Sequence, residues 1–80
     1  MAELERIGII GLGLIGGSIA AGLKRVGGYE THAFDADPDA TKAGLSMGIV
    51  DVAHLTVADL ANGVDVVCLC TPVRSMTPLL

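Results

Sequence analysis

The stretch RIGIIGLGLIG, residues 6–16, decides how this chain folds. Residues 6–10 form a short, almost continuously apolar run, which is typical of a strand buried on both faces of a parallel sheet. Residues 11–16 then have the spacing GxGxxG. Apolar residues recur beyond this turn at steps of four, four and three: Ile15, Ile19, Leu23 and Val26. This period predicts a helix over residues 14–26, with the stripe on one face.

The rest of the chain alternates between the same two patterns. Further strands are predicted at residues 30–35, 49–55 and 64–70, and further helices at residues 38–47 and 56–62. Alternation of this kind implies parallel strands joined by right-handed helical crossovers. The sequence therefore predicts an α/β fold, the N-terminal half of a Rossmann-type doubly wound parallel sheet with strand order 3-2-1-4. Residues 1–80 are expected to be the N-terminal part of one dinucleotide-binding domain, truncated and without a substrate or dimerisation domain.

Each glycine of the GxGxxG turn has a physical reason in this context, between a buried strand and a helix. Gly11 permits the tight turn out of the strand, and Gly13 has no side chain to keep a pyrophosphate from the backbone. Gly16 lets the helix pack closely on the sheet. The free N–H groups of the first helical turn, including those of Leu14 and Ile15, would face the phosphates. The alternative is a glycine-rich turn without a ligand.

Asp35 supplies the second part of a dinucleotide fingerprint. It ends the second predicted strand, 19 positions after Gly16, close to the ~20 expected of an acid that binds the adenosine ribose. A carboxylate there accepts the ribose hydroxyls and repels a 2′-phosphate. Neither Ala36 nor Asp37 offers a positive charge. NAD is therefore predicted over NADP.

Thr71, Pro72 and Val73 follow the fourth predicted strand. With strand order 3-2-1-4 that strand lies beside the first, and a dinucleotide crosses the sheet between their carboxyl ends. We expect these three residues to line that crevice. The alternative is that the proline only terminates the strand.

Composition excludes several other classes of protein. The net charge is −4 and the chain has one Tyr, one Phe and no Trp, so a nucleic-acid surface is not expected. Residues 7–23 carry no charge, but a membrane span needs about 20 apolar residues and six of these 17 are glycine. Neither a membrane partner nor a metal site is therefore predicted. Cys68 and Cys70 are expected to be reduced strand residues, which favours a cytoplasmic location.

No constellation of catalytic residues is apparent in the sequence. His32 and His54 have no Cys or Ser suited to a dyad with either of them, and both are interpreted as structural or surface residues. Ser18 is expected to satisfy a backbone group or to touch the cofactor. Four acids are expected to be solvated: Glu30, Asp51, Asp59 and Asp65.

Three stretches resemble the prephenate and arogenate dehydrogenase family. They are GLGLIGGS at residues 11–18, LKRVGGYETHAFDADPDATKAGLSMGIVD at residues 23–51, and CTPVRSM at residues 70–76. The resemblance implies an NAD-dependent oxidative decarboxylation of prephenate to 4-hydroxyphenylpyruvate, in tyrosine biosynthesis, by a parent protein that is a homodimer. The family's catalytic histidine lies in a G-x-H-P motif, which neither His32 nor His54 matches. The 80-residue chain alone is therefore expected to bind NAD and to be inactive.

Two alternatives remain open at this point. One is a stand-alone NAD(H)-binding or regulatory module without catalysis. The other is a fragment of a different NAD-dependent dehydrogenase, of the arogenate or β-hydroxyacid type.

Overall fold

The structure is a computed structural model that describes residues 4–70. Strands and helices alternate strictly along this part of the chain. Their bounds are β1 (Glu5–Ile10), α1 (Leu14–Val26), β2 (Tyr29–Phe34), α2 (Pro38–Ser46), β3 (Val52–Ala53), α3 (Val57–Gly63) and β4 (Val66–Leu69). The order of elements is the one predicted, and helix α1 has the predicted bounds.

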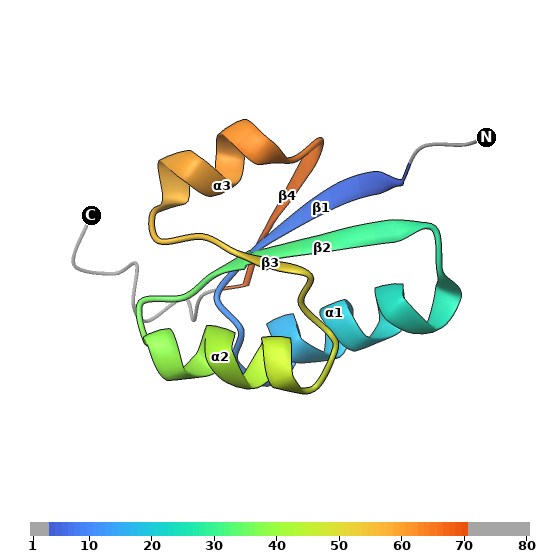
Figure 1. Cartoon of the computed structure of the whole chain (residues 1–80), viewed down its shortest axis with the longest axis horizontal. Helices are drawn as coiled ribbons and strands as arrows, with labels where there is room; N and C mark the ends of the chain where they lie inside the picture. Colours follow the sequence, from blue (N-terminus) through green and yellow to red (C-terminus); the bar gives the residue numbers. More distant parts are fainter. Residues whose placement is uncertain (1–3, 71–80) are drawn as a thin grey trace.

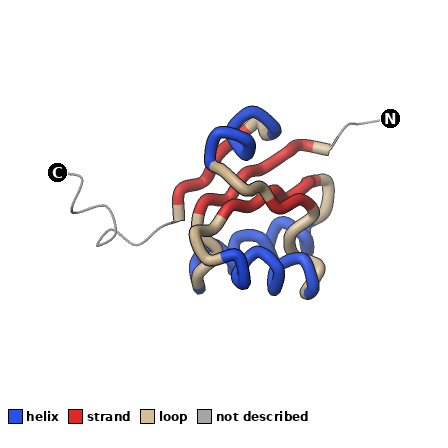
Figure 2. The backbone as a smooth tube through the Cα atoms, turned by 60° about the vertical axis from the view of Figure 1, so that its left-hand side comes forward, coloured by secondary structure: helices blue, strands red, loops and turns tan. Residues whose placement is uncertain are grey.

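The four strands form one parallel sheet in the order β3-β2-β1-β4, which confirms the predicted Rossmann-type topology. Helices α1 and α2 cover one face of the sheet and α3 covers the other (Figure 1). The same three layers are visible from a second direction (Figure 2). This arrangement brings the carboxyl ends of β1 and β2 to one edge, where the glycine-rich turn begins.

Helix α1 packs on the sheet through small residues. The two ends of the apolar stripe lie outside this contact, since Ile15 and Val26 are 68% and 77% exposed. The buried residues of α1 are Gly16 and Ala20. Small side chains let the helix axis come close to β1, so the bulky residues on either side are left at the rim of the contact.

Strand β3 is shorter than predicted: residues 49–55 contribute only Val52 and Ala53 to the sheet. Side chains hold the segment before it. The Asp51 carboxylate accepts a hydrogen bond from the backbone N–H of Thr31 at 2.8 Å and pairs with Lys24 of α1. The Thr31 hydroxyl donates to the carbonyl of Ile49 at 2.7 Å. These contacts add to the backbone hydrogen bond from the N–H of Asp51 to the carbonyl of Thr31, at 2.8 Å, and Asp51 is therefore not merely solvated.

Asp65 is exposed, as expected of a solvated acid, but it also has a partner. Its carboxylate accepts hydrogen bonds from the backbone N–H of Arg6 at 2.9 Å and from the guanidinium at 3.3 Å. The Arg6 N–H and side chain lower the pKa of Asp65. The pair joins the start of β1 to the segment just before β4.

Residues 7–23, which carry no charge, divide into β1, the turn and most of α1, as predicted. Within residues 4–70, no helix has both the length and the apolar character needed to cross a bilayer.

Candidate functional site

The glycine-rich turn is held by backbone contacts that only glycine allows. Gly11 has a φ of 93°, in the region that favours glycine, and its N–H donates to the carbonyl of Phe34 at 2.8 Å. A Cβ on Gly16 would lie 2.0 Å from the carbonyl oxygen of Gly11. The turn out of β1 and the close approach of α1 are therefore both built as the sequence predicted.

Helix α1 starts without a cap of its own, unlike the other two helices of the described chain. Its N-cap residue is Gly13, no side chain accepts from its first N–H groups, and its first turn carries no acid. Helix α2 is capped by Asp37, and α3 by Thr56, and each has an acid in its first turn. The positive end of the α1 dipole is thus left open, as an anion site requires.

The space in front of this helix start is open. A Cβ on Gly13 would meet nothing within 4 Å, so within residues 4–70 the space beside Gly13 is open. Leu14 and Ile15 are exposed on the first turn, at 89% and 68%. The backbone is therefore accessible from solvent at the point where the sequence placed a pyrophosphate.

Asp35 lies directly beyond β2 and binds the glycine-rich turn. One carboxylate oxygen accepts from the backbone N–H of Leu12 at 2.7 Å, and the other accepts from the N–H of Asp37 at 2.8 Å. Sequence reasoning placed Asp35 at this edge but did not foresee the link to Leu12. Each oxygen accepts one hydrogen bond here and keeps capacity for another, so the half-buried carboxylate can still accept ribose hydroxyls.

Thr71, Pro72 and Val73 lie outside the described residues, so their predicted role is not tested by the structure. Ser18, the other polar residue near the turn, donates its hydroxyl to the carbonyl of Leu14 at 2.8 Å. This is the local backbone role that the sequence analysis offered for it.

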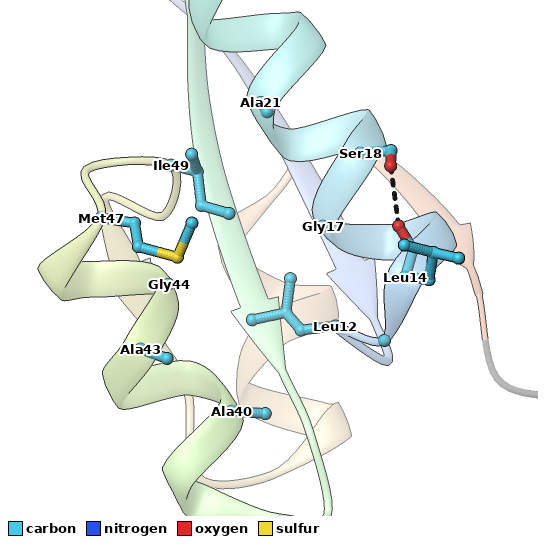
Figure 3. A pocket seen from close by; sticks show the side chains of 11 residues that line it. Leu12, Leu14, Gly17, Ser18, Ala21, Ala40, Ala43, Gly44, Met47 and Ile49 are labelled. Carbon is cyan, nitrogen blue, oxygen red and sulfur yellow. Dashed lines mark hydrogen bonds between the residues drawn. The ribbon is translucent and has the colours of Figure 1, made fainter.

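Two hollows adjoin the site. The larger, of about 620 Å³, lies between α1 and α2, and its lining includes Leu12, Met47 and Ile49 (Figure 3). Ser18 is the one polar side chain among its described lining residues, and the start of α1, at Gly13, Leu14 and Gly17, borders it. The smaller, of about 330 Å³, lies beside Asp35 and is bounded on another side by His54 and Leu55.

His32 and His54 form a pair that sequence reasoning missed. His32 Nδ1 lies 2.7 Å from His54 Nε2, and His32 Nε2 lies 2.6 Å from Glu30 Oε1. Glu30 is thus a partner of a buried histidine and not a solvated acid. The spacing of Glu30 and His32, two apart on a strand, is the signal that could have indicated their contact, because such residues share one face.

Cys68 and Cys70 are free thiols, as predicted. Partial burial, with the nearby Cys68 as a smaller cause, raises the pKa of Cys70, so its thiol is not activated as a nucleophile. Within residues 4–70, no group of three or more potential ligand side chains is arranged to hold a metal ion.

Fold and site together define the nucleotide-binding half of a Rossmann domain: a parallel 3-2-1-4 sheet, an uncapped helix start after a glycine-rich turn, and an acid beyond β2. Residues 6–80 match the family described as NADP oxidoreductase, coenzyme F420-dependent. The chain belongs to this family.

Two solved structures are similar to the chain over almost its whole length. One is prephenate dehydrogenase from A. aeolicus in complex with hydroxyphenyl propionate and NAD⁺, with 28% identity over 98% of this chain and a TM-score of 0.81. The other is arogenate dehydrogenase from Synechocystis, with 30% identity over 92% of this chain and a TM-score of 0.80. The chain spans 28% and 26% of the lengths of these two proteins.

Proposed function

We propose that this chain is the NAD-binding part of a prephenate dehydrogenase. The similarity to a prephenate dehydrogenase solved with NAD⁺ supports this proposal, as does the resemblance of residues 11–18, 23–51 and 70–76 to that enzyme family. A bound nicotinamide dinucleotide would supply the hydride acceptor for the oxidation. The residues of this chain would bind and orient it.

The choice of NAD over NADP rests on Asp35. The family description names NADP, whereas one of the similar structures holds NAD⁺, so the residues themselves must decide. The Asp35 carboxylate faces the glycine-rich turn, and the residues after it are Ala36, Asp37 and Pro38. A 2′-phosphate would meet negative charge there, and none of residues 36–38 is an arginine.

Each residue of the site has a proposed task. Gly11 and Gly16 shape the turn, Gly13 admits the pyrophosphate, and the backbone N–H groups around Leu14 and Ile15 bind it. Asp35 accepts the ribose hydroxyls. Three further residues are proposed to line the crevice beside β1: Thr71, Pro72 and Val73.

The reaction, the substrate and the assembly are proposals for the parent protein. We propose that it converts prephenate to 4-hydroxyphenylpyruvate, acts as a homodimer and is cytoplasmic. The 80-residue chain by itself is proposed to bind NAD without turnover, because no residue in it matches the family's G-x-H-P motif. Measurable oxidation of prephenate by the isolated chain would contradict this.

The experiment that tests the proposal is a calorimetric titration of the chain with NAD and with NADP. We expect NAD to bind at least about tenfold more tightly, a difference of ~1.4 kcal/mol. The variant Asp35→Asn keeps one oxygen that can accept from Leu12 but removes the charge and the acceptor for the Asp37 N–H, so the two affinities should converge. Asp39→Asn, which removes one exposed acid from the first turn of α2, should keep the original preference. Equal binding of both cofactors by the unchanged chain would contradict the role of Asp35.

A further inference from the structure

A continuous hydrogen-bonded chain runs from Glu30 through His32 to His54. The separations are 2.6 Å from Glu30 Oε1 to His32 Nε2 and 2.7 Å from His32 Nδ1 to His54 Nε2. The two imidazole rings are stacked, with centroids 5.0 Å apart and planes inclined by 15°. His32, at the centre, is only 6% exposed. Neither ring nitrogen of His32 is therefore free to exchange partners easily.

The hydrogen-bonded series from Glu30 to His54 ends at the wall of the smaller hollow. His54 and Leu55 form one side of the 330 Å³ pocket, and Asp35 and Ala36 form part of another. His54 follows directly after β3, which pairs with β2 over only two residues. Its backbone N–H donates to the carbonyl of Ala33 at 2.9 Å, and its imidazole is anchored by His32. The backbone of this wall is thus held by β2, and the orientation of the His54 imidazole by His32.

The hydrogen-bond partners of the two imidazole rings determine which ring nitrogens carry a hydrogen. His32 Nε2 faces a carboxylate and must carry a hydrogen, so in neutral His32 the Nδ1 atom is an acceptor. His54 Nε2 must then donate to it. One extra proton can be added at His54 Nδ1 without disturbing either bond. A second proton, on His32 Nδ1, would place two N–H groups against each other across 2.7 Å, and the bond between the rings would be lost.

Several charged groups lie around the histidine pair. Glu30 lies beside His32, and its partner in the β1 register is Arg6, which is already paired with Asp65. Strand β3 carries no titratable residue, and α3 carries one acid, Asp59, in its exposed first turn. Asp35 lines the same hollow as His54.

We propose that Glu30, His32 and His54 make the adenosine end of the dinucleotide site sensitive to protons. The singly protonated or neutral pair holds His54 in the wall beside Asp35, and NAD binds. Uptake of the second proton releases the His54 imidazole from His32, changes its orientation in the wall and weakens binding. This inference rests on the proposed NAD site and adds a regulatory property to it.

The test is the affinity of the full 80-residue chain for NAD between about pH 8 and about pH 5.5. The chain has only two histidines, and histidine is the only side chain that ordinarily titrates in this range. Release of one proton on binding limits the slope to about tenfold in affinity for each pH unit. We expect the affinity for NAD to fall as the pH is lowered, with a slope approaching that limit in the acid part of the range. An affinity that does not change with pH overturns the proposal.

The variant His54→Gln distinguishes the histidine pair from other causes of a pH-dependent affinity. Its amide can donate to His32 Nδ1 or, with the amide reversed, accept from it, so no clash arises at either protonation state. We expect its ratio of affinities at the two pH limits to stay below about twofold. Asp59→Asn, which removes an acid from the adjacent helix, should keep the dependence of the unchanged chain. The same pH dependence in His54→Gln as in the unchanged chain overturns the proposal.

A second readout needs no cofactor. In NMR spectra the two imidazole Hε1 signals should titrate in two separate steps, and the amide signals of Leu55 and Ala36 should move with the second. If NAD does not bind at any pH, the proposed function fails while these spectra still decide the inference. A single step shared by both rings, with unmoved Leu55 and Ala36 signals, overturns it.

Discussion

Gly16 lies directly against Gly11, so that a Cβ on Gly16 would be 2.0 Å from the carbonyl oxygen of Gly11 and 3.0 Å from its carbonyl carbon. Both obstacles are backbone atoms at the turn between β1 and α1, which cannot move aside without shifting the helix. The contact couples the shape of the turn to the seating of α1 on the sheet.

Gly16→Ala should therefore destabilise the chain by about 3 kcal/mol or more in a urea titration, as severe overpacking does. The matched control is Gly22→Ala in the same helix, where a Cβ would meet nothing within 4 Å. That variant should gain about 0.5–1 kcal/mol from the better helix propensity of alanine. Equal stability of the two variants would contradict the packing role of Gly16.

Gly13→Ala should separate binding from folding. A Cβ at this position has open space around it, so the cost in stability should not exceed the ~1 kcal/mol of a poorer N-cap. The same methyl group would occupy the place proposed for the pyrophosphate. NAD binding, measured by calorimetry, should be lost in Gly13→Ala and kept in Gly22→Ala. Undiminished binding in Gly13→Ala would show that the phosphates lie elsewhere.

Asp51 should stabilise the fold more at neutral pH than in acid. Partial burial raises the pKa of Asp51, but its bonds to Lys24 and Thr31 outweigh this and hold the pKa below its ordinary value. A carboxyl whose pKa is lowered by folding contributes stability above its unfolded pKa and loses that contribution as the pH falls.

Asp51→Asn should therefore cost roughly 1 kcal/mol at pH 7, the scale of a lost charged hydrogen bond, and less at pH 3, which lies below the ordinary carboxyl pKa. Thermal unfolding at both pH values measures this. Asp59→Asn serves as the control, since the Asp59 side chain is exposed on the first turn of α3, and it should change stability by only a few tenths of a kcal/mol. A cost for Asp51→Asn that persists undiminished in acid would refute the ionic origin.

Leu60 should carry most of the attachment of α3 to the sheet. It is fully buried, and its side chain lies over Gly8 of β1, where a Cβ on Gly8 would be 3.2 Å away. Leu60→Ala should cost about 2–5 kcal/mol. Leu55→Ala removes the same group from a side chain that is 91% exposed and should cost little. Chemical denaturation of both variants checks the difference.

Local patterns were sufficient to predict the order of elements, the sheet topology and the turn. The apolar run before Gly11, the spacing of the glycines and the cap at Asp37 each depend on neighbours in the sequence. The contact of α1 with the sheet was predicted at Gly16 but not at Ala20, because the period of the large apolar residues does not reveal that small residues face the sheet. The length of β3 was also overestimated. The segment before Val52 is held by the hydrogen bond between Thr31 and Asp51, which are far apart in the sequence.

The candidate site was likewise predicted only in part from the sequence. Gly11, Gly13 and Gly16 could be placed from the motif, and Asp35 from its distance along the chain. The bond from Leu12 to Asp35 and the bond between His32 and His54 join residues 23 and 22 positions apart. Side-chain contacts at such separations depend on strand register, which sequence periodicity does not supply.

The open start of α1 has a consequence for the lifetime of the protein. Helices α2 and α3 complete their first turns with their own side chains, but α1 must complete its first turn with a ligand or with water. A dinucleotide present at a hundred times its dissociation constant would stabilise the folded chain by about 2.7 kcal/mol. Resistance to proteolysis should then rise and fall with the supply of cofactor, so that the protein persists longest when the cell can use it.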